Sequence, residues 1–101
     1  MIGRFTDWLF RRPTGTSEHG TPLRLIPRGW TEVFDQGRLE IRKRDRKEHC
    51  SDYYFPIEGG RIVHEVFGFG WSGSGSQDIS EVPRAIRPWL KYQQQRKSEP
   101  E

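Results

Sequence analysis

Two histidines, a cysteine and an aspartate are the residues whose types could support catalysis or metal binding. His49, Cys50 and Asp52 are close in sequence, and His64 lies on a nearby segment with the alternation of a strand. A cysteine nucleophile needs a base held by a third group, and a metal site needs three or four converging ligands. The spacing matches no recognised motif, and His64 stands between apolar residues at alternate positions, as a structural histidine does. We therefore expect no catalytic residue, metal or cofactor, and keep a small enzyme or metal protein centred on Cys50 and His64 as a third hypothesis.

A basic run, RKRDRK at residues 42–47, is the strongest candidate for binding. Lysines and arginines in such a run contact either phosphate groups or acidic protein surfaces. Basic residues predominate in 1–30, 38–48 and 84–101, whereas acidic residues predominate in 49–83. This layout favours an acidic partner surface or a phosphate backbone over a uniformly cationic coat. The alternative is that the run is only a solvated hairpin tip.

An aromatic–glycine run, FGFGW at residues 67–71, permits two interpretations. Exposed aromatic rings on a sheet can stack unpaired nucleic-acid bases, and the basic run would then follow the phosphates. The other interpretation places Phe67, Phe69 and Trp71 in the core beneath the C-terminal helix. We favour the core, because hydrophobic residues make up only 32% of the chain and aromatic residues make up 13%.

The N-terminal residues form an apolar stripe with helical spacing. Ile2, Phe5, Trp8 and Leu9 recur at intervals of three and four, and Pro13 ends the pattern. The polar segment 14–22 that follows predicts a loop or flexible tether. The helix is expected either to dock on a partner or to fold back over the sheet, and we do not expect membrane binding because one short helix anchors weakly.

Strand and turn signals fill the middle of the chain. Alternating or β-prone residues predict strands, and DQG and EGG predict turns at 35–37 and 58–60. The polar segments 45–52 and SGSGS at 72–76 are expected to be loops. The expected strands are residues 23–26, 30–34, 38–44, 53–57 and 61–71.

The last quarter of the chain predicts a helix. Asp78 followed by Glu81 resembles a capping box, and the apolar residues that follow share one helical face. Pro88 would remove a bond inside that helix, so we expect a kink or a new helix start there. The polar residues from Gln93 onward are expected to fray.

These elements predict one α+β domain. The expected fold is a small antiparallel sheet of three to five strands, with a C-terminal helix packed on one face and a short N-terminal amphipathic helix. The expected divisions are the helix at 1–13, the polar linker at 14–22, the single domain at 23–95 and a disordered tail at 96–101. A single cysteine and the lack of a recognisable signal sequence or membrane span favour a cytoplasmic location.

The sequence favours a non-catalytic protein-binding or accessory module. The expected partner is another protein with an acidic or apolar surface. The alternative is a nucleic-acid-binding protein that uses the basic loop and the sheet aromatics, and the third hypothesis is the small enzyme or metal protein above. The expected protein contacts are Phe5, Trp8, Arg42, Arg44, Arg46 and Lys47, and the expected nucleic-acid contacts add Lys43, Tyr53, Tyr54, Phe67 and Phe69.

Overall fold

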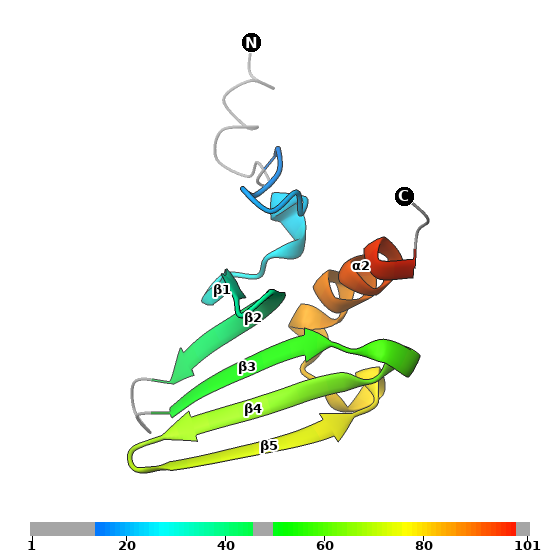
Figure 1. Cartoon of the computed structure of the whole chain (residues 1–101). Helices are drawn as coiled ribbons and strands as arrows, with labels where there is room; N and C mark the ends of the chain where they lie inside the picture. The colour runs from blue at the N-terminus through cyan, green and yellow to red at the C-terminus, as the bar shows by residue number, and fades with distance from the viewer. Residues whose placement is uncertain (1–13, 46–49, 99–101) are drawn as a thin grey trace.

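The computed structural model of the protein describes residues 14–45 and 50–98, and it shows an α+β fold (Figure 1). Five antiparallel strands lie in the sheet in the order in which they occur in the chain, β1-β2-β3-β4-β5. The helix α2 and the short 3-10 turns before it lie against one face of this sheet. The strands are β1 (Trp30–Asp35), β2 (Arg38–Asp45), β3 (Cys50–Pro56), β4 (Ile62–Gly68) and β5 (Trp71–Gln77), and α2 is Arg87–Ser98.

The first hairpin follows the sequence prediction closely. Strands were expected at 30–34 and 38–44, and β1 and β2 extend each of these by one residue. Between them Gln36 and Gly37 both have positive φ, 53° and 78°, which is the type I′ geometry that suits the twist of two adjoining strands. Asp35 therefore pairs with Arg38, and the register runs on to Trp30 opposite Lys43.

The central strand begins earlier than its composition indicates. The polar segment 45–52 was expected to be a loop, but β3 begins at Cys50, and residues 46–49 lie outside the described part of the chain. Pro56 ends β3, as expected for a residue that cannot donate a ladder hydrogen bond.

The last hairpin corrects two expectations. The run 61–71 was expected to be one long strand and SGSGS to be a flexible loop. Instead the chain turns at Phe69 and Gly70, where Gly70 has a φ of 79°, and the serine–glycine segment becomes most of β5. Every residue of β5 pairs with β4, from Gly68 opposite Trp71 to Ile62 opposite Gln77.

The core lies between α2 and one face of the sheet. The sheet contributes Ile41, Tyr54 and Ile62, which lie on neighbouring central strands. The helical side contributes Val82, which lies between the two 3-10 turns, Ile86 from the second turn, and Trp89 and Leu90 from α2; the last three are fully buried. Burying a side chain of this size contributes about 1.5–3 kcal/mol, so this layer carries much of the stability.

The C-terminal segment contains two short 3-10 turns before its α-helix, where the sequence predicts one helix. Residues 79–86 form two 3-10 turns, Ile79–Glu81 and Arg84–Ile86, and the α-helix begins afresh at Arg87 with Pro88 in its first turn. The expected new start at Pro88 is thus confirmed to within one residue. The helix continues to Ser98, with Gln93 only 6% exposed, so the expectation of a frayed tail from Gln93 is wrong. The expected disordered tail at 96–101 stays a prediction, and residues 99–101 lie outside the described part of the chain.

Asp78 caps the first of these 3-10 turns rather than an α-helix. Its carboxylate accepts hydrogen bonds from the backbone N–H and the hydroxyl of Ser80, at 3.1 Å and 2.6 Å. These bonds from Ser80 hold the pKa of Asp78 below its ordinary value. The Glu81 N–H donates to the backbone carbonyl of Asp78 at 2.9 Å. Among the described residues no side-chain bond joins Asp78 and Glu81, so the expected capping box is replaced by a local turn.

The segment 14–22 is an ordered loop rather than a flexible tether. Thr16 bridges to Pro22, and the Ser17 N–H donates to the carbonyl of Thr21 at 2.7 Å. Residues 23–26, expected as a strand, instead contain the 3-10 turn Leu23–Leu25. The expected N-terminal helix 1–13, with Phe5 and Trp8, lies outside the described residues. In the described part of the chain no helix is both long and apolar enough to cross a membrane.

Candidate functional site

The sheet face opposite α2 carries a continuous group of charged and aromatic side chains. Because side chains alternate along a strand, the strand register assigns to this face the residues that do not contact the helix. No described element covers it (Figure 1). We call it the open face, and its residues include Val33, Arg38, Glu40, Arg42, Arg44, Tyr53, Phe55, Val63, Glu65 and Phe67.

Glu40 occupies the centre of an arginine–carboxylate network on the open face. It is fully buried although no helix covers it, because Arg38 and Arg42 on the same strand close over it. The Arg38 Nε donates to Glu40 Oε2 at 2.5 Å, and the Arg42 Nε and Nη2 donate to Oε1 at 2.9 Å and 2.7 Å. Charge-assisted bonds of this kind fix the planar guanidinium groups in position.

The network extends across the sheet through further carboxylates. Arg38 Nη2 donates to Glu65 on β4 at 2.9 Å, and Arg42 Nη2 donates to Asp35 on β1 at 3.1 Å. Burial works to lower the pKa of Arg42, but hydrogen bonding and attraction to Glu40, with contributions from Tyr53 and Asp35, raise it above its ordinary value. Arg42 therefore remains charged at every physiological pH.

Both arginines also stack on aromatic rings. The Arg38 guanidinium carbon lies 4.0 Å from the centre of the Phe55 ring, and that of Arg42 lies 4.0 Å from the centre of the Tyr53 ring. Tyr53 in turn contacts Phe67, with ring centres 4.8 Å apart. One face of Tyr53 and one of Phe55 are thus already occupied by arginine.

A hollow opens beside this network, at the end of the sheet where β2 and β3 approach the 46–49 segment. Its volume is about 480 Å³, and its lining residues include Thr31 and Ser51, which carry hydroxyl groups, and Arg42 and Arg44, which carry positive charge. Arg44 is exposed there, and no ion pair joins it to another described residue. The hollow can therefore accept an anionic group. It is lined by Gly29, Thr31, Val33, Arg42, Lys43, Arg44, Ser51 and Tyr53.

The structure separates the sequence-predicted binding residues into several groups. Arg42, Arg44, Tyr53 and Phe67 lie together on the open face, and Phe67 is 39% exposed. Phe5, Trp8, Arg46 and Lys47 lie outside the described residues.

The remaining predicted residues do not lie on the open face. Lys43 points to the helix side, with its ammonium 5.5 Å from the centre of the Trp30 ring. Tyr54 is only 5% exposed and belongs to the core, where a base cannot reach it. Phe69 stands in the β4–β5 turn and is 92% exposed.

The expected aromatic core at 67–71 is wrong. Phe67, Phe69 and Trp71 are all exposed, and none of them belongs to the buried cluster. The reason is the turn at Phe69 and Gly70, which reverses the chain and so places Phe67 and Trp71 on opposite faces of the sheet. Gly68 leaves room for the Trp71 indole, which lies where a methyl group on residue 68 would be.

The residues considered for chemistry form a pair instead of a cluster. His64 Nε2 and Asp52 Oδ1 are 2.8 Å apart, and the imidazole stacks on Tyr54 with ring centres 4.2 Å apart. Cys50 is buried. His64 pairs with Tyr54 across the sheet, and Cys50 lies four residues before Tyr54 on β3, which is about 13 Å at the usual rise of a strand. Cys50 and His64 therefore do not form a nucleophile–base pair. Within the described residues no three His, Cys, Asp or Glu side chains converge as metal ligands.

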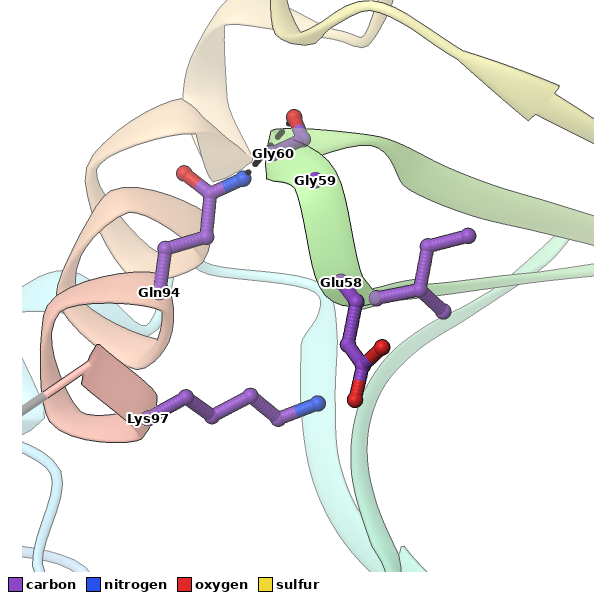
Figure 2. Close-up of a pocket in the computed structure, with 6 residues that line it drawn as sticks. Glu58, Gly59, Gly60, Gln94 and Lys97 are labelled. Atoms are coloured by element: carbon purple, nitrogen blue, oxygen red, sulfur yellow. Dashed lines mark hydrogen bonds between the residues drawn. The ribbon is translucent and has the colours of Figure 1, made fainter.

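A second hollow, of about 410 Å³, lies between the end of α2 and the turn Glu58–Gly60 (Figure 2). Two of its polar groups already bind the turn region: Gln94 Nε2 donates to the Gly60 carbonyl at 3.2 Å, and Lys97 Nζ donates to the Pro56 carbonyl at 2.9 Å. These bonds hold the helix end against the sheet, which is a structural role.

Sequence reasoning missed the residues at the centre of the open face, namely Arg38, Glu40, Phe55 and Glu65. The alternation at 38–44 does place Arg38, Glu40 and Arg42 on one side of a strand, and this was the available signal. Comparison with protein-family models, with curated proteins and with solved structures gives no match.

Proposed function

We propose that this protein is a non-catalytic protein-binding module and that the open face of its sheet is the contact surface. The observation that carries the proposal is the arginine–carboxylate–aromatic network, which is fully formed on the face that α2 leaves uncovered. Binding sites on proteins are enriched in arginine and aromatic residues, and these residues contribute most of the binding energy.

The network also lowers the entropic cost of binding. Arg38 and Arg42 are each held by two carboxylates and one ring, so little side-chain freedom remains to be lost when a partner arrives. An immobilised long side chain otherwise costs about 0.5–1.5 kcal/mol. This face is therefore already organised in the free protein.

The chemistry of the face fits a protein segment that carries a carboxylate next to apolar side chains. Arg44 and the hollow beside it offer positive charge and hydroxyl groups to the carboxylate. Phe67, 39% exposed, offers an apolar contact a short way across the sheet. Arg46, Lys47, Phe5 and Trp8 remain proposed contacts on their sequence pattern alone.

A nucleic acid fits the same face less well. Base stacking needs free ring faces, but Arg42 covers one face of Tyr53, and Tyr54 is buried on the other side of the sheet. Asp35, Glu40 and Glu65 neutralise much of the arginine charge that a phosphate backbone would need. An oligonucleotide therefore serves as a competing probe in the test.

The test uses a synthetic peptide of alternating glutamate and leucine, a matched peptide with glutamine for glutamate, and a mixed-sequence single-stranded oligonucleotide. NMR titration of the full chain with the glutamate peptide is expected to shift amide signals of Arg42, Arg44 and Tyr53. Arg44→Glu should weaken this binding by about tenfold or more, because it puts a like charge against the peptide. The matched control is Arg84→Glu, the same charge change at an exposed residue beside α2.

Three outcomes would overturn the proposal. The first is that the glutamate and glutamine peptides bind with equal affinity and shift the amide signals of residues other than Arg42, Arg44 and Tyr53. The second is equal loss of binding in the Arg44 and Arg84 variants. The third is binding of the oligonucleotide alone, with an affinity that falls steeply as salt is added, which would establish nucleic-acid binding instead.

A further inference from the structure

The strand β5 forms a free edge of the sheet (Figure 1). Six of its seven residues are exposed, and no described element lies along its outer side. Natural proteins usually protect such an edge with a charged residue, a proline or a bulge, since its unpaired backbone groups can bind another strand. The sequence of β5, WSGSGSQ, contains no charge and no proline, and its pairing with β4 is continuous, without a bulge.

The backbone of this edge is open to hydrogen bonding. In an antiparallel strand, alternate residues direct both their N–H and their C=O groups away from the paired neighbour. Along β5 the recorded side-chain contact with such a group is at one end, where Arg61 Nη2 donates to the Ser76 carbonyl at 3.0 Å. The middle of the strand, around Ser74, thus presents unpaired backbone groups flanked only by small side chains.

The residues of this edge are arranged symmetrically. Residues 72–76 read Ser-Gly-Ser-Gly-Ser in both directions, with Ser74 at the centre. An antiparallel strand pair related by a two-fold axis at Ser74 would set serine opposite serine and glycine opposite glycine. Cross-strand serine hydroxyls can hydrogen-bond, and the side chains of residues 72–75 oppose the approach with neither charge nor bulk. At Ser76 the Arg61 guanidinium, which donates to the hydroxyl and the carbonyl, has to move aside for the pairing to reach that end. The strand that fits the β5 edge best is therefore β5 of a second copy of this chain.

The residues at both ends of β5 are also compatible with this pairing. With the axis at Ser74, Trp71 of one copy lies opposite Gln77 of the other, and the β4–β5 turn lies beside the segment that follows the other copy's β5. That turn carries Phe69, which is 92% exposed, and Trp71 is 55% exposed. The pairing gives both rings a neighbouring chain to contact.

We propose that two copies of this protein associate through β5, edge to edge, in an antiparallel two-fold dimer. The two five-stranded sheets then form one continuous sheet, which closes both free β5 edges. The bonds come from the backbone and the side chains are small, so the buried area is low and the dimer dissociates on dilution. The open faces of the two copies lie on the same side of the joined sheet, because the axis is perpendicular to it.

The test is the molar mass of the full chain in solution, measured by sedimentation over a range of concentrations. The unchanged chain is expected to shift from 12.0 kDa toward twice that mass as concentration rises. Ser74→Glu should remain a monomer, because two glutamates would face each other across the axis. Ser74→Ala is the matched control and should dimerise like the unchanged chain, since the backbone is intact. Ser74 is exposed, so circular dichroism should show the same fold in every variant.

A mixing experiment distinguishes self-pairing from binding of a foreign strand. Ser74→Lys and Ser74→Glu are each expected to be monomeric or weakly associated alone, and an equal mixture should form dimers because lysine then faces glutamate. Three results would overturn the proposal: a monomer at every concentration for the unchanged chain, a dimer that Ser74→Glu leaves intact, or assemblies larger than a dimer.

Discussion

Glu40 is a charged residue that is fully buried on a sheet face without a helix above it. A buried carboxylate is tolerated only when its charge and lone pairs are satisfied, and here Arg38 and Arg42 supply both. These contacts also fix the positions of the two arginines, because each guanidinium group is held between Glu40 and an aromatic ring. Glu40 thus organises the candidate site without being available to contact a partner.

Tyr54 lies on the opposite face and is the described residue with the largest shift in pKa. It is 5% exposed and packs against the imidazole of His64 and the ring of Trp30. Burial raises the pKa of Tyr54 to about 12, and the charge of Asp52 adds to the increase. The phenol therefore stays neutral in the folded protein at pH values where an exposed tyrosine ionises.

This shift predicts a loss of stability in alkali. The unfolded chain releases the Tyr54 proton near pH 10 and the folded chain near pH 12, so unfolding is increasingly favoured as pH rises between these values. The stabilisation that Tyr54 contributes is present below pH 10 and is lost by about pH 12, with a magnitude of about 2–3 kcal/mol. Urea denaturation at a series of pH values measures it.

The control for this prediction is Tyr54→Phe, which keeps the ring and removes the ionisable group. The variant should show a shallower decline of unfolding free energy above pH 10 than the unchanged chain. Identical declines in both proteins would show that Tyr54 ionises normally in the folded state.

The turns between strands determine the arrangement of the sheet. Gln36 has a φ of 53°, a conformation that costs an ordinary residue about 1 kcal/mol, while Gly37 beside it adopts 78° at little cost. Glutamine is thus tolerated here because the pairing of β1 with β2 fixes the turn. The strain is local and can be relieved by one substitution.

We predict that Gln36→Gly raises the free energy of unfolding. Glycine adopts the positive φ readily, although it also adds freedom to the unfolded chain, so the net gain should be about 0.5 kcal/mol. Gln36→Val, which resists positive φ, should lower stability by about 1 kcal/mol or more. Urea denaturation midpoints of the three proteins provide the comparison, and equal midpoints for glycine and valine would contradict the prediction.

The sequence predicts hairpins well where turn residues and alternation agree. Asp35, Gln36 and Gly37 supply turn chemistry between two alternating segments, and β1 and β2 follow to within one residue. At the last hairpin these signals conflict. Phe69 is apolar and β-prone although it stands in the turn, and serine and glycine have low strand propensity although they form β5. The strand exists because β4 supplies a continuous ladder for it, which no local pattern reveals.

The candidate site was predictable only in part for the same reason. Alternation identifies which residues of β2 share a face, but it does not tell which face the helix covers. The basic run in the sequence identifies Arg42 and Arg44, whereas Phe55 and Glu65 become part of the site through strand pairing across β3 and β4. Contacts between residues far apart in sequence therefore account for what the sequence analysis missed.

At the scale of the whole molecule, the loop 14–22 joins the sheet and the helix into one unit. The carboxylate of Glu32 on β1 accepts bonds from the Ser17 hydroxyl at 2.5 Å and from the Trp89 indole at 2.8 Å. The Arg96 guanidinium donates to the carbonyl of His19 at 2.9 Å, and the Tyr92 hydroxyl donates to that of Gly20 at 3.2 Å. Segments more than 50 residues apart thus depend on one another, so we expect them to unfold together.

The contact between Thr21 and Gln93 gives the sharpest test of this coupling. Thr21 is fully buried and Gln93 is 6% exposed, and the Gln93 Nε2 donates to the Thr21 hydroxyl at 2.8 Å. Thr21→Val keeps the shape but removes the acceptor, so the buried amide loses its partner and stability should fall by about 1–3 kcal/mol. Tryptophan fluorescence and circular dichroism during urea denaturation should report the same lowered midpoint.

A double variant separates the lost bond from the altered packing. Gln93→Leu in the Thr21→Val background removes the stranded amide, so much of the stability should return, as expected when both partners of a buried bond become apolar. Thr21→Ser keeps the hydroxyl and should cost only the buried methyl group, about 1 kcal/mol. If Thr21→Val left the midpoint unchanged, the loop 14–22 would not be held against α2 in solution. If fluorescence and circular dichroism gave different midpoints, the loop, sheet and helix would not form one cooperative unit.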